Sequence, residues 1–98
     1  MIPKDELWQI IGRIPAGKVA SYGEVGKALR NPASGYMVGR WMVNCPAYVP
    51  WWRVVGKNGD ILTGKRSPEL GIEQENRLKE EGVNVAGGLV DKTAFVQL

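Results

Sequence analysis

The chain has 98 residues, 44% of them hydrophobic, which is enough for one domain over residues 1–98 with a modest core. Its 13 basic and 10 acidic residues give a net charge of +3, which is compatible with a polyanionic partner such as nucleic acid. The single cysteine, Cys45, cannot form an internal disulfide, and a chain without histidine has little to offer zinc. Because it also lacks a bilayer-length apolar run and a signal-peptide layout, we expect a cytoplasmic protein without metal or cofactor.

The first half of the chain predicts three helices. Residues 4–14 place apolar side chains at helical spacing, and a Pro-Ala-Gly step ends that helix. A second helix over residues 22–29 is stopped by an Asn-Pro step. Ser34 is placed to cap a third helix that runs to about Asn44, with an inner side formed by Met37, Val38, Trp41 and Met42. The second and third helices have the outline of a helix-turn-helix, although an ordinary helical hairpin is at least as frequent.

The second half of the chain predicts a hairpin and a long helix. Residues 54–63 place β-rich runs around an Asn-Gly step, the strongest short hairpin signal, and predict a small β wing. Ser67 is placed to cap a helix that begins at Pro68 and ends at Gly82. Residues 83–98 are expected to form a loop with a short extended piece. The predicted fold class is mainly α with a small β-hairpin, like a winged helix-turn-helix DNA-binding domain.

Several short motifs follow one another along residues 5–82. Residues 14–25 read IPAGKVASYGEV and match the pattern Ile-Pro-x-Gly-x-Val-x-x-Tyr-Gly, while residues 49–55 read VPWWRVV. Further matches occur at Asn31-Pro32, Val38-Gly39, Thr63-Gly64 and Glu81-Gly82. These motifs occur in the same order and at nearly the same spacing in the C-terminal domain of the O6-alkylguanine-DNA alkyltransferases, which the chain therefore resembles. A series of matches is far more specific than any one short pattern.

The resemblance exposes a change at the reactive centre. The family signature reads Pro-Cys-His-Arg-Val, with the cysteine as alkyl acceptor and the histidine as its base, whereas this chain has Trp51 and Trp52 at those places. Alkyl transfer requires a thiolate and a group that generates it, and tryptophan supplies neither. The chain therefore resembles the alkyltransferase-like proteins, which implies a damage sensor and not an enzyme. Cys45 is an alternative nucleophile, for which a buried inert thiol is the expected role.

The resemblance also implies residues that contact DNA. Tyr22 matches the tyrosine that rotates the phosphate beside the target nucleotide, and Ser21 adds a second phosphate contact. Tyr36 stands where relatives carry an arginine that fills the gap left by the flipped nucleotide. Arg40 lies one helical turn later on the same face, so either side chain is a candidate for this finger. The structural alternatives are a half-exposed tyrosine for Tyr22 and a solvated helix charge for Arg40.

A lesion pocket completes the implied site. Trp51 is expected to form a wall against an extruded alkylated base, while Trp52 belongs either to the pocket or to the scaffold. Core packing is the structural alternative for both tryptophans. Arg53 is expected to hold the loop by ion pairing and Glu81 to be structural. The other predicted lining residues are Tyr22, Val49, Pro50, Leu62, Thr63 and Gly64.

The resemblance implies a complete function. The expected partner is double-stranded DNA containing O6-alkylguanine, bound through the minor groove as a monomer with the damaged nucleotide flipped. The complex is expected to present the damage to the recognition proteins of nucleotide excision repair. Lys65 and Arg66 are expected to contact a phosphate or a protein partner. The rival hypotheses are a helix-turn-helix module without lesion specificity, a transferase using Cys45, and a small protein-interaction domain.

Overall fold

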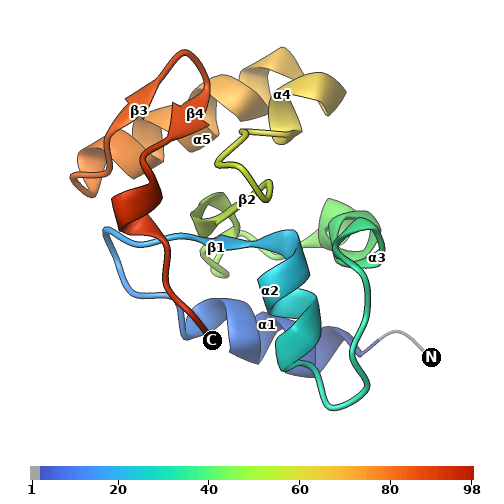
Figure 1. Ribbon diagram of the computed structural model, residues 1–98. Coiled ribbons are helices and arrows are strands. Elements are labelled where there is room, and N and C mark those ends of the chain that lie inside the picture. Colours follow the sequence, from blue (N-terminus) through green and yellow to red (C-terminus); the bar gives the residue numbers. More distant parts are fainter. Residues whose placement is uncertain (1–2) are drawn as a thin grey trace.

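The computed structural model describes residues 3–98. Residues 1 and 2, which begin the N-terminal stretch that lacks a signal-peptide layout, lie outside the described residues. None of the helices in residues 3–98 has the length and apolar character that a bilayer crossing requires. The elements, drawn in Figure 1, are α1 (Lys4–Gly12), β1 (Ala20–Ser21), α2 (Tyr22–Ala28), α3 (Gly35–Trp41), η1 (Met42–Asn44), η2 (Trp51–Arg53), β2 (Val54–Val55), α4 (Thr63–Arg66), α5 (Pro68–Glu80), β3 (Val85–Ala86), β4 (Leu89–Val90) and η3 (Lys92–Ala94).

A short parallel strand pair separates two hydrophobic clusters. Strand β1 pairs with β2, so that Ala20 lies opposite Val54 and Ser21 lies opposite Val55. Consecutive strand residues point to opposite faces, and accordingly Val54 packs in the first cluster and Val55 in the second. Figure 1 shows the two strands between α1 and α2 on one side and α4 and α5 on the other. The strand pair is therefore the layer that joins the two halves of the molecule.

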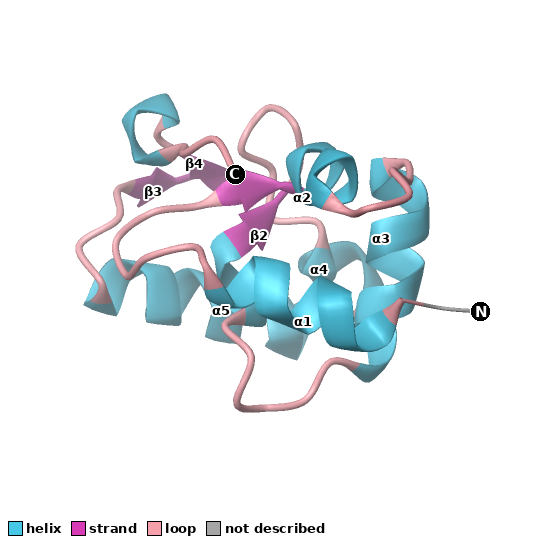
Figure 2. Cartoon of the chain, turned by 90° about the horizontal axis from the view of Figure 1, so that it is seen from below, coloured by secondary structure: helices cyan, strands magenta, loops and turns pink. Residues whose placement is uncertain are grey.

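Each cluster belongs to one half of the molecule. The first is built on the apolar stripe of α1 and includes Leu7, Ile10, Ile11, Val25, Leu29 and Val38. The second joins α5 to the C-terminal segment through Val19, Leu78, Val83, Val90 and Ala94. Seen from below, β3 and β4 lie at the end of the molecule opposite α3 (Figure 2). The helix-turn-helix therefore lies toward the end of the molecule away from the β3–β4 hairpin.

Helices α2 and α3 form the predicted helix-turn-helix and pack closely. Ser21 caps α2 by accepting a hydrogen bond from the Glu24 N–H at 3.0 Å, and Ser34 caps α3 in the same way, as predicted. A side chain at Gly26 would place its Cβ 2.0 Å from the Ala33 carbonyl oxygen. Only glycine permits this approach, which brings the turn between the helices against α2. The close packing fixes how α3 projects from the fold.

Three details of the predicted helices require correction. Helix α1 ends at Gly12 and not at Ile14, because the chain leaves the helix through a tight turn at Arg13. Helix α3 ends at Trp41, and the segment to Asn44 continues as a 3₁₀ turn. The side chain of Met37 was expected on the inner side, but it is 38% exposed. Helix α5 begins at Pro68 under a Ser67 cap and ends just before Gly82, as predicted.

The hairpin predicted for residues 54–63 is wrong in its position. The Asn-Gly step does form a turn, in which the Gly56 N–H donates to the Asp60 carbonyl at 2.8 Å. The chain then runs into α4 instead of returning along β2. The reason is that β2 pairs in parallel with β1, while the Val54 carbonyl accepts a hydrogen bond from the Gln74 side chain at 2.9 Å. Tertiary contacts therefore outweigh the local hairpin signal.

The antiparallel hairpin lies in the C-terminal segment, where a loop with a short extended piece was predicted. Strands β3 and β4 pair antiparallel across Gly87 and Gly88, both of which have positive φ angles. This conformation suits a tight turn whose twist matches that of the strands. Asp60 forms an isolated bridge with Leu89, so the hairpin also supports the turn after β2. The fold class is mainly α with a small β-hairpin, as predicted, although the hairpin occupies a different segment.

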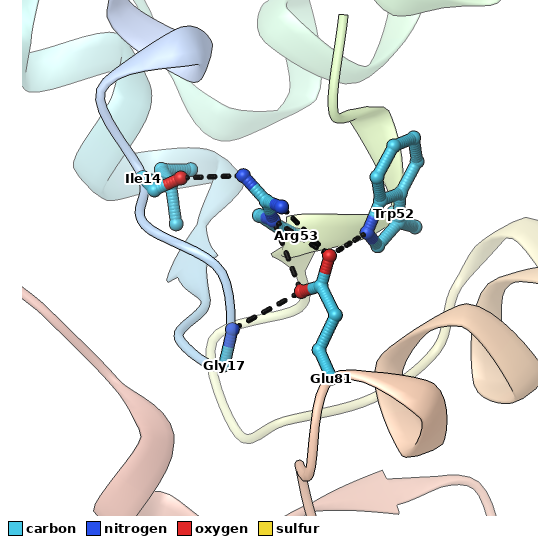
Figure 3. Close-up of polar contacts among 5 residues, drawn as sticks. All are labelled: Ile14, Gly17, Trp52, Arg53 and Glu81. Carbon is cyan, nitrogen blue, oxygen red and sulfur yellow. Dashed lines mark hydrogen bonds and ion pairs between the residues drawn. The ribbon is translucent and has the colours of Figure 1, made fainter.

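The Glu81 carboxylate joins three segments of the chain (Figure 3). Its oxygens accept from the Arg53 guanidinium, with the shortest contact at 2.7 Å, and from the Trp52 indole N–H at 3.0 Å. The Gly17 N–H donates to the same carboxylate at 3.1 Å. Arg53 also donates to the Ile14 carbonyl at 2.9 Å. The end of α5 is thereby fixed to the turn after α1 and to η2, which confirms the ion-pairing role predicted for Arg53.

Desolvation opposes ionisation of Glu81, but the hydrogen bonds from Arg53, Trp52 and Gly17 outweigh it and hold the pKa of this carboxyl below its ordinary value of 4.5. The folded-state pKa is therefore lower than the unfolded one. The resulting stabilisation is complete above about pH 4.5 and is lost as the pH falls through the folded-state pKa.

Glu81→Gln should lower the free energy of unfolding at neutral pH by roughly 2 kcal/mol, because it leaves the largely buried Arg53 charge without its counter-ion. Urea unfolding at neutral pH and below the carboxyl pKa measures the effect, and the difference from wild type should shrink in acid. The control is Glu75→Gln, which breaks an exposed pair with Lys79 that is worth at most about 0.5 kcal/mol. Equal losses for the two variants would contradict the central role of Glu81.

Candidate functional site

Helix α3 presents Tyr36 and Arg40 on one exposed face. Tyr36 lies in the first turn and is 71% exposed. Arg40, four residues later, donates from Nη1 to the Tyr36 hydroxyl at 3.2 Å, and its guanidinium carbon lies 5.9 Å from the centre of the ring. The Arg40 guanidinium therefore contacts the Tyr36 side chain. This contact confirms that the two predicted finger candidates share a face.

An open groove of about 530 Å³ runs beside these two residues and is called the outer groove below. Helix α3 forms one side, and the turn after β2 together with α4 forms the other. A smaller hollow of about 240 Å³, the inner cavity, adjoins it and shares five of its lining residues, Tyr22, Gly39, Val43, Thr63 and Arg66. The remaining residues of the outer groove are Gly23, Gly35, Tyr36, Arg40, Gly56, Lys57 and Leu62, and those of the inner cavity are Met42, Cys45, Ala47, Trp51, Leu70 and Glu73.

Tyr22, the first residue of α2, forms part of both walls. Burial raises the pKa of its phenol, and the nearby positive charge of Arg66 partly offsets this effect. The hydroxyl is therefore protonated at neutral pH and able to donate a hydrogen bond. The neighbouring Ser21 uses a lone pair of its hydroxyl to cap α2, which leaves the hydroxyl hydrogen free to donate. Both predicted phosphate contacts thus lie at the start of α2.

The two tryptophans of the signature point to different parts of the molecule. Their rings meet edge to face, with centroids 6.0 Å apart and an angle of 87° between the planes. Trp51 packs against the first cluster and lines the inner cavity. Trp52 packs against the second cluster and donates to Glu81, while the Arg53 and Arg77 guanidinium carbons lie 5.4 and 4.6 Å from its ring centre. Trp51 is therefore a cavity residue and Trp52 a scaffold residue.

Some of the other predicted pocket residues line the groove, whereas others lie away from it. Leu62 and Thr63 line the outer groove, although the buried Thr63 hydroxyl already donates to Gln74 at 2.6 Å. Val49 packs in the first cluster and, with Pro50, borders a separate depression beside Trp8. The prediction placed these two residues in the lesion pocket and left Trp52 to either the pocket or the scaffold, and none of the three lines the inner cavity or the outer groove. Nearness along the chain does not decide what a side chain packs against, since Val49 packs in the first cluster while Trp52 packs against the second.

Gly64 has a packing role. Its backbone lies against Gly71 of α5, where a Cβ added to Gly71 would be 2.7 Å from the Gly64 Cα. The two small residues allow the short helix α4 to cross α5 at close range. Gly64 therefore supports the wall formed by α4 and does not itself line the outer groove or the inner cavity.

Sequence reasoning missed several lining residues. Gly39 and Val43 belong to the i, i+4 row that begins at Gly35 on α3, and this spacing could have revealed them. Gly39 gives room for the Tyr22 ring, which lies 3.9 Å from the position of an added Cβ. Lys57 and Glu73 come from a turn and from α5, and no local pattern links them to α3. Tertiary structure alone brings these segments to one cavity.

Cys45 also lines the inner cavity, together with Trp51. Burial raises the pKa of its thiol to about 11, so that only about one thiol in ten thousand is ionised at neutral pH. The chain has no histidine that could accept the thiol proton. The position of Cys45 is thus suited to contact with a bound group, while its ionisation state is unsuited to nucleophilic attack. Among residues 3–98, no group of three His, Cys, Asp or Glu side chains is arranged to hold a metal ion.

Comparison with known proteins places this site in a family. Residues 3–83 match the family described as 6-O-methylguanine DNA methyltransferase, DNA binding domain. A DNA base-flipping protein of Escherichia coli is 40% identical over 89 residues, which cover 87% of this chain and 66% of that protein. Alkyltransferase-like protein 1 of Schizosaccharomyces pombe is 35% identical over 83 residues, which cover 82% of this chain and 75% of that protein.

A solved structure agrees over the whole length of the chain. The S. pombe protein Atl1, in complex with damaged DNA containing O6-carboxymethylguanine, superimposes with a TM-score of 0.81 at 28% identity and full coverage of both chains. The family match spans both the helix-turn-helix and the signature segment that carries Trp51. The chain therefore belongs to the family of the 6-O-methylguanine DNA methyltransferase DNA-binding domain, and within it to the alkyltransferase-like proteins.

Proposed function

We propose that this protein binds duplex DNA containing O6-alkylguanine, flips the damaged nucleotide into the inner cavity, and leaves the alkyl group in place. The observation that carries the proposal is that Trp51, at the position of the alkyl acceptor, lines a cavity that adjoins the face of Tyr36 and Arg40. A base-binding cavity and a DNA-facing helix thus remain where the reactive group has been lost.

The exposed face of α3 supports binding in the minor groove. An exposed aromatic ring inserted between base pairs replaces stacking that is lost when a nucleotide leaves the helix. Tyr36 offers such a ring, and the Arg40 guanidinium contacts its hydroxyl and adds a positive charge for the DNA backbone. Tyr22 lines the inner cavity, and Ser21, the residue before it, caps α2; both have hydroxyl groups able to donate to phosphate. These contacts suit a nucleotide that rotates out of the stack next to α2.

The composition of the inner cavity supports binding of a flat, partly apolar group. Its walls include the aromatic rings of Trp51 and Tyr22 and the apolar side chains of Met42, Val43 and Leu70. Flipped bases are held by stacking against such side chains. At about 240 Å³, the cavity is smaller than the roughly 300–1,000 Å³ typical of drug-sized ligands, which suits a single base with a small substituent.

A bound lesion that is not repaired by this protein needs another repair activity, and the family resemblance implies nucleotide excision repair through its damage-recognition proteins. We also propose that the protein binds as a monomer, since one helix-turn-helix and one cavity suffice for one flipped nucleotide.

Trp51→Ala should reduce discrimination between O6-methylguanine and guanine more than it reduces overall DNA affinity, because it removes the aromatic wall of the inner cavity. Titration of matched duplexes at one stated salt concentration gives the ratio of the two dissociation constants. The wild-type protein should prefer the damaged duplex, and the variant should lose most of that preference. Equal affinity of the wild type for both duplexes would support a helix-turn-helix module without lesion specificity instead.

Tyr36→Ala should weaken binding to the damaged duplex by about 1–3 kcal/mol, or roughly 5- to 150-fold, because the inserted ring is lost. Tyr48→Ala provides a matched control, since Tyr48 is also a surface tyrosine, 82% exposed, but borders the depression beside Trp8. A fluorescent base analogue placed next to the lesion reports whether flipping is lost together with affinity. Similar losses for the two variants would remove Tyr36 from the finger role.

A second candidate function, alkyl transfer to Cys45, is favoured by the presence of this thiol in the inner cavity. Its raised pKa argues against the reaction, so prolonged incubation with an O6-methylguanine duplex should leave the protein mass unchanged and the DNA methylated. Intact-protein mass spectrometry and analysis of the DNA bases measure both. A methyl increment that disappears in Cys45→Ser would establish the transferase and overturn the non-enzymatic proposal.

A further inference from the structure

Three positive side chains from separate elements surround the outer groove without a carboxylate partner. Arg40 comes from α3, Lys57 from the turn after β2, and Arg66 from the end of α4. Within residues 3–98, the ion pairs lie elsewhere: Arg53 with Glu81, Arg77 with Glu73, and Lys79 with Glu75. Cations gathered around one groove repel one another unless an anion binds there. The groove is therefore suited to an anionic ligand.

The opposite charge is collected on another surface. The outer face of α5 carries Glu69, Glu73 and Glu80 around the exposed side chain of Ile72, and the cation Arg77 lies among them. The only acidic side chain in the turn after β2 is Asp60, and it forms no ion pair with Lys57 in the described part of the chain. Glu73, which reaches the inner cavity, is paired with Arg77. The groove side of the molecule thus keeps its uncompensated positive charge.

The turn that carries Lys57 is held on several sides. The Gly59 N–H donates to the Gly56 carbonyl at 2.9 Å, which closes the turn. The Val90 N–H of β4 donates to the Gly59 carbonyl at 2.9 Å, and the Ile61 N–H donates to the Gly88 carbonyl at 3.1 Å. These bonds join the turn to the β3–β4 hairpin, so the backbone is fixed while the exposed lysine side chain projects from it. A fixed turn places this charge reproducibly at the groove.

We propose that the turn of residues 56–60 is a second edge for binding the DNA backbone, across the outer groove from α3, and that Lys57 is its phosphate contact. This inference rests on the proposed function. DNA that lies on Tyr36 and Arg40 and sends a nucleotide toward Trp51 has its backbone beside the groove that Lys57 lines. The lysine ammonium is a compact charge on a flexible stem, which suits a phosphate contact without sequence selectivity.

Lys57→Gln should weaken binding to the damaged and the undamaged duplex by the same factor, on the order of five- to tenfold near 0.1 M salt. The slope of log K against log salt concentration should fall by about 0.9, as expected for the loss of one phosphate contact. The preference for O6-methylguanine should be unchanged, because Lys57 does not line the inner cavity. Lys57→Arg should retain both the affinity and the slope.

The matched control is Lys92→Gln in η3, which removes one exposed lysine and the same net charge away from the groove. A salt slope that falls equally in both variants would mean a general effect of net charge and would overturn the inference. An unchanged slope in Lys57→Gln would also overturn it. Failure of the proposed function has a different signature, since the wild-type protein itself would then show no preference for the damaged duplex.

Discussion

The Glu81 carboxylate is the interaction on which the site depends. It accepts hydrogen bonds from Trp52, Arg53 and Gly17, which come from η2 and from the turn after α1. Both halves of the molecule are joined through this largely buried group, and Arg53 extends the connection to the Ile14 carbonyl. Because Trp52 and Arg53 of η2 are held in this way, Trp51, the first residue of η2, faces the inner cavity. The position of the cavity wall is thus set by an ion pair outside the cavity.

The signature segment keeps a cavity and a supporting ion pair, although its two central positions hold tryptophan in place of cysteine and histidine. At the two places where the family signature has cysteine and histidine, Trp51 lines the inner cavity and Trp52 donates its indole N–H to Glu81. The Arg53–Glu81 pair keeps its structural task whether or not a reaction follows. The remaining thiol, Cys45, is beside the cavity but protonated. Neither of the two residues that the signature places at the reactive centre therefore carries a thiol or an imidazole.

Local sequence signals determined the helical half of the fold. Ser34 and Ser67 occupy cap positions with a helix-forming run behind each, and a cap depends on a few neighbouring residues. The helix-turn-helix, the course of α5 and the ion-pairing role of Arg53 follow from such local patterns together with the order of the family motifs. Tyr36 and Arg40 share a face because helical periodicity places residues four apart on one side.

Tertiary structure decided the strands and the membership of the cavity. The Asn-Gly turn was visible in the sequence, but β2 pairs with the distant β1, and the hairpin forms instead at Gly87 and Gly88. Nothing local distinguishes Trp51 from Trp52, yet the two rings belong to separate clusters because η2 turns consecutive side chains apart. Lys57 lines the outer groove because the backbone of its turn is held by a hydrogen bond from Val90 of β4 to the Gly59 carbonyl. The sequence by itself determined the family, the caps and the lost nucleophile, whereas contacts between distant segments decided which side chains meet around the cavity.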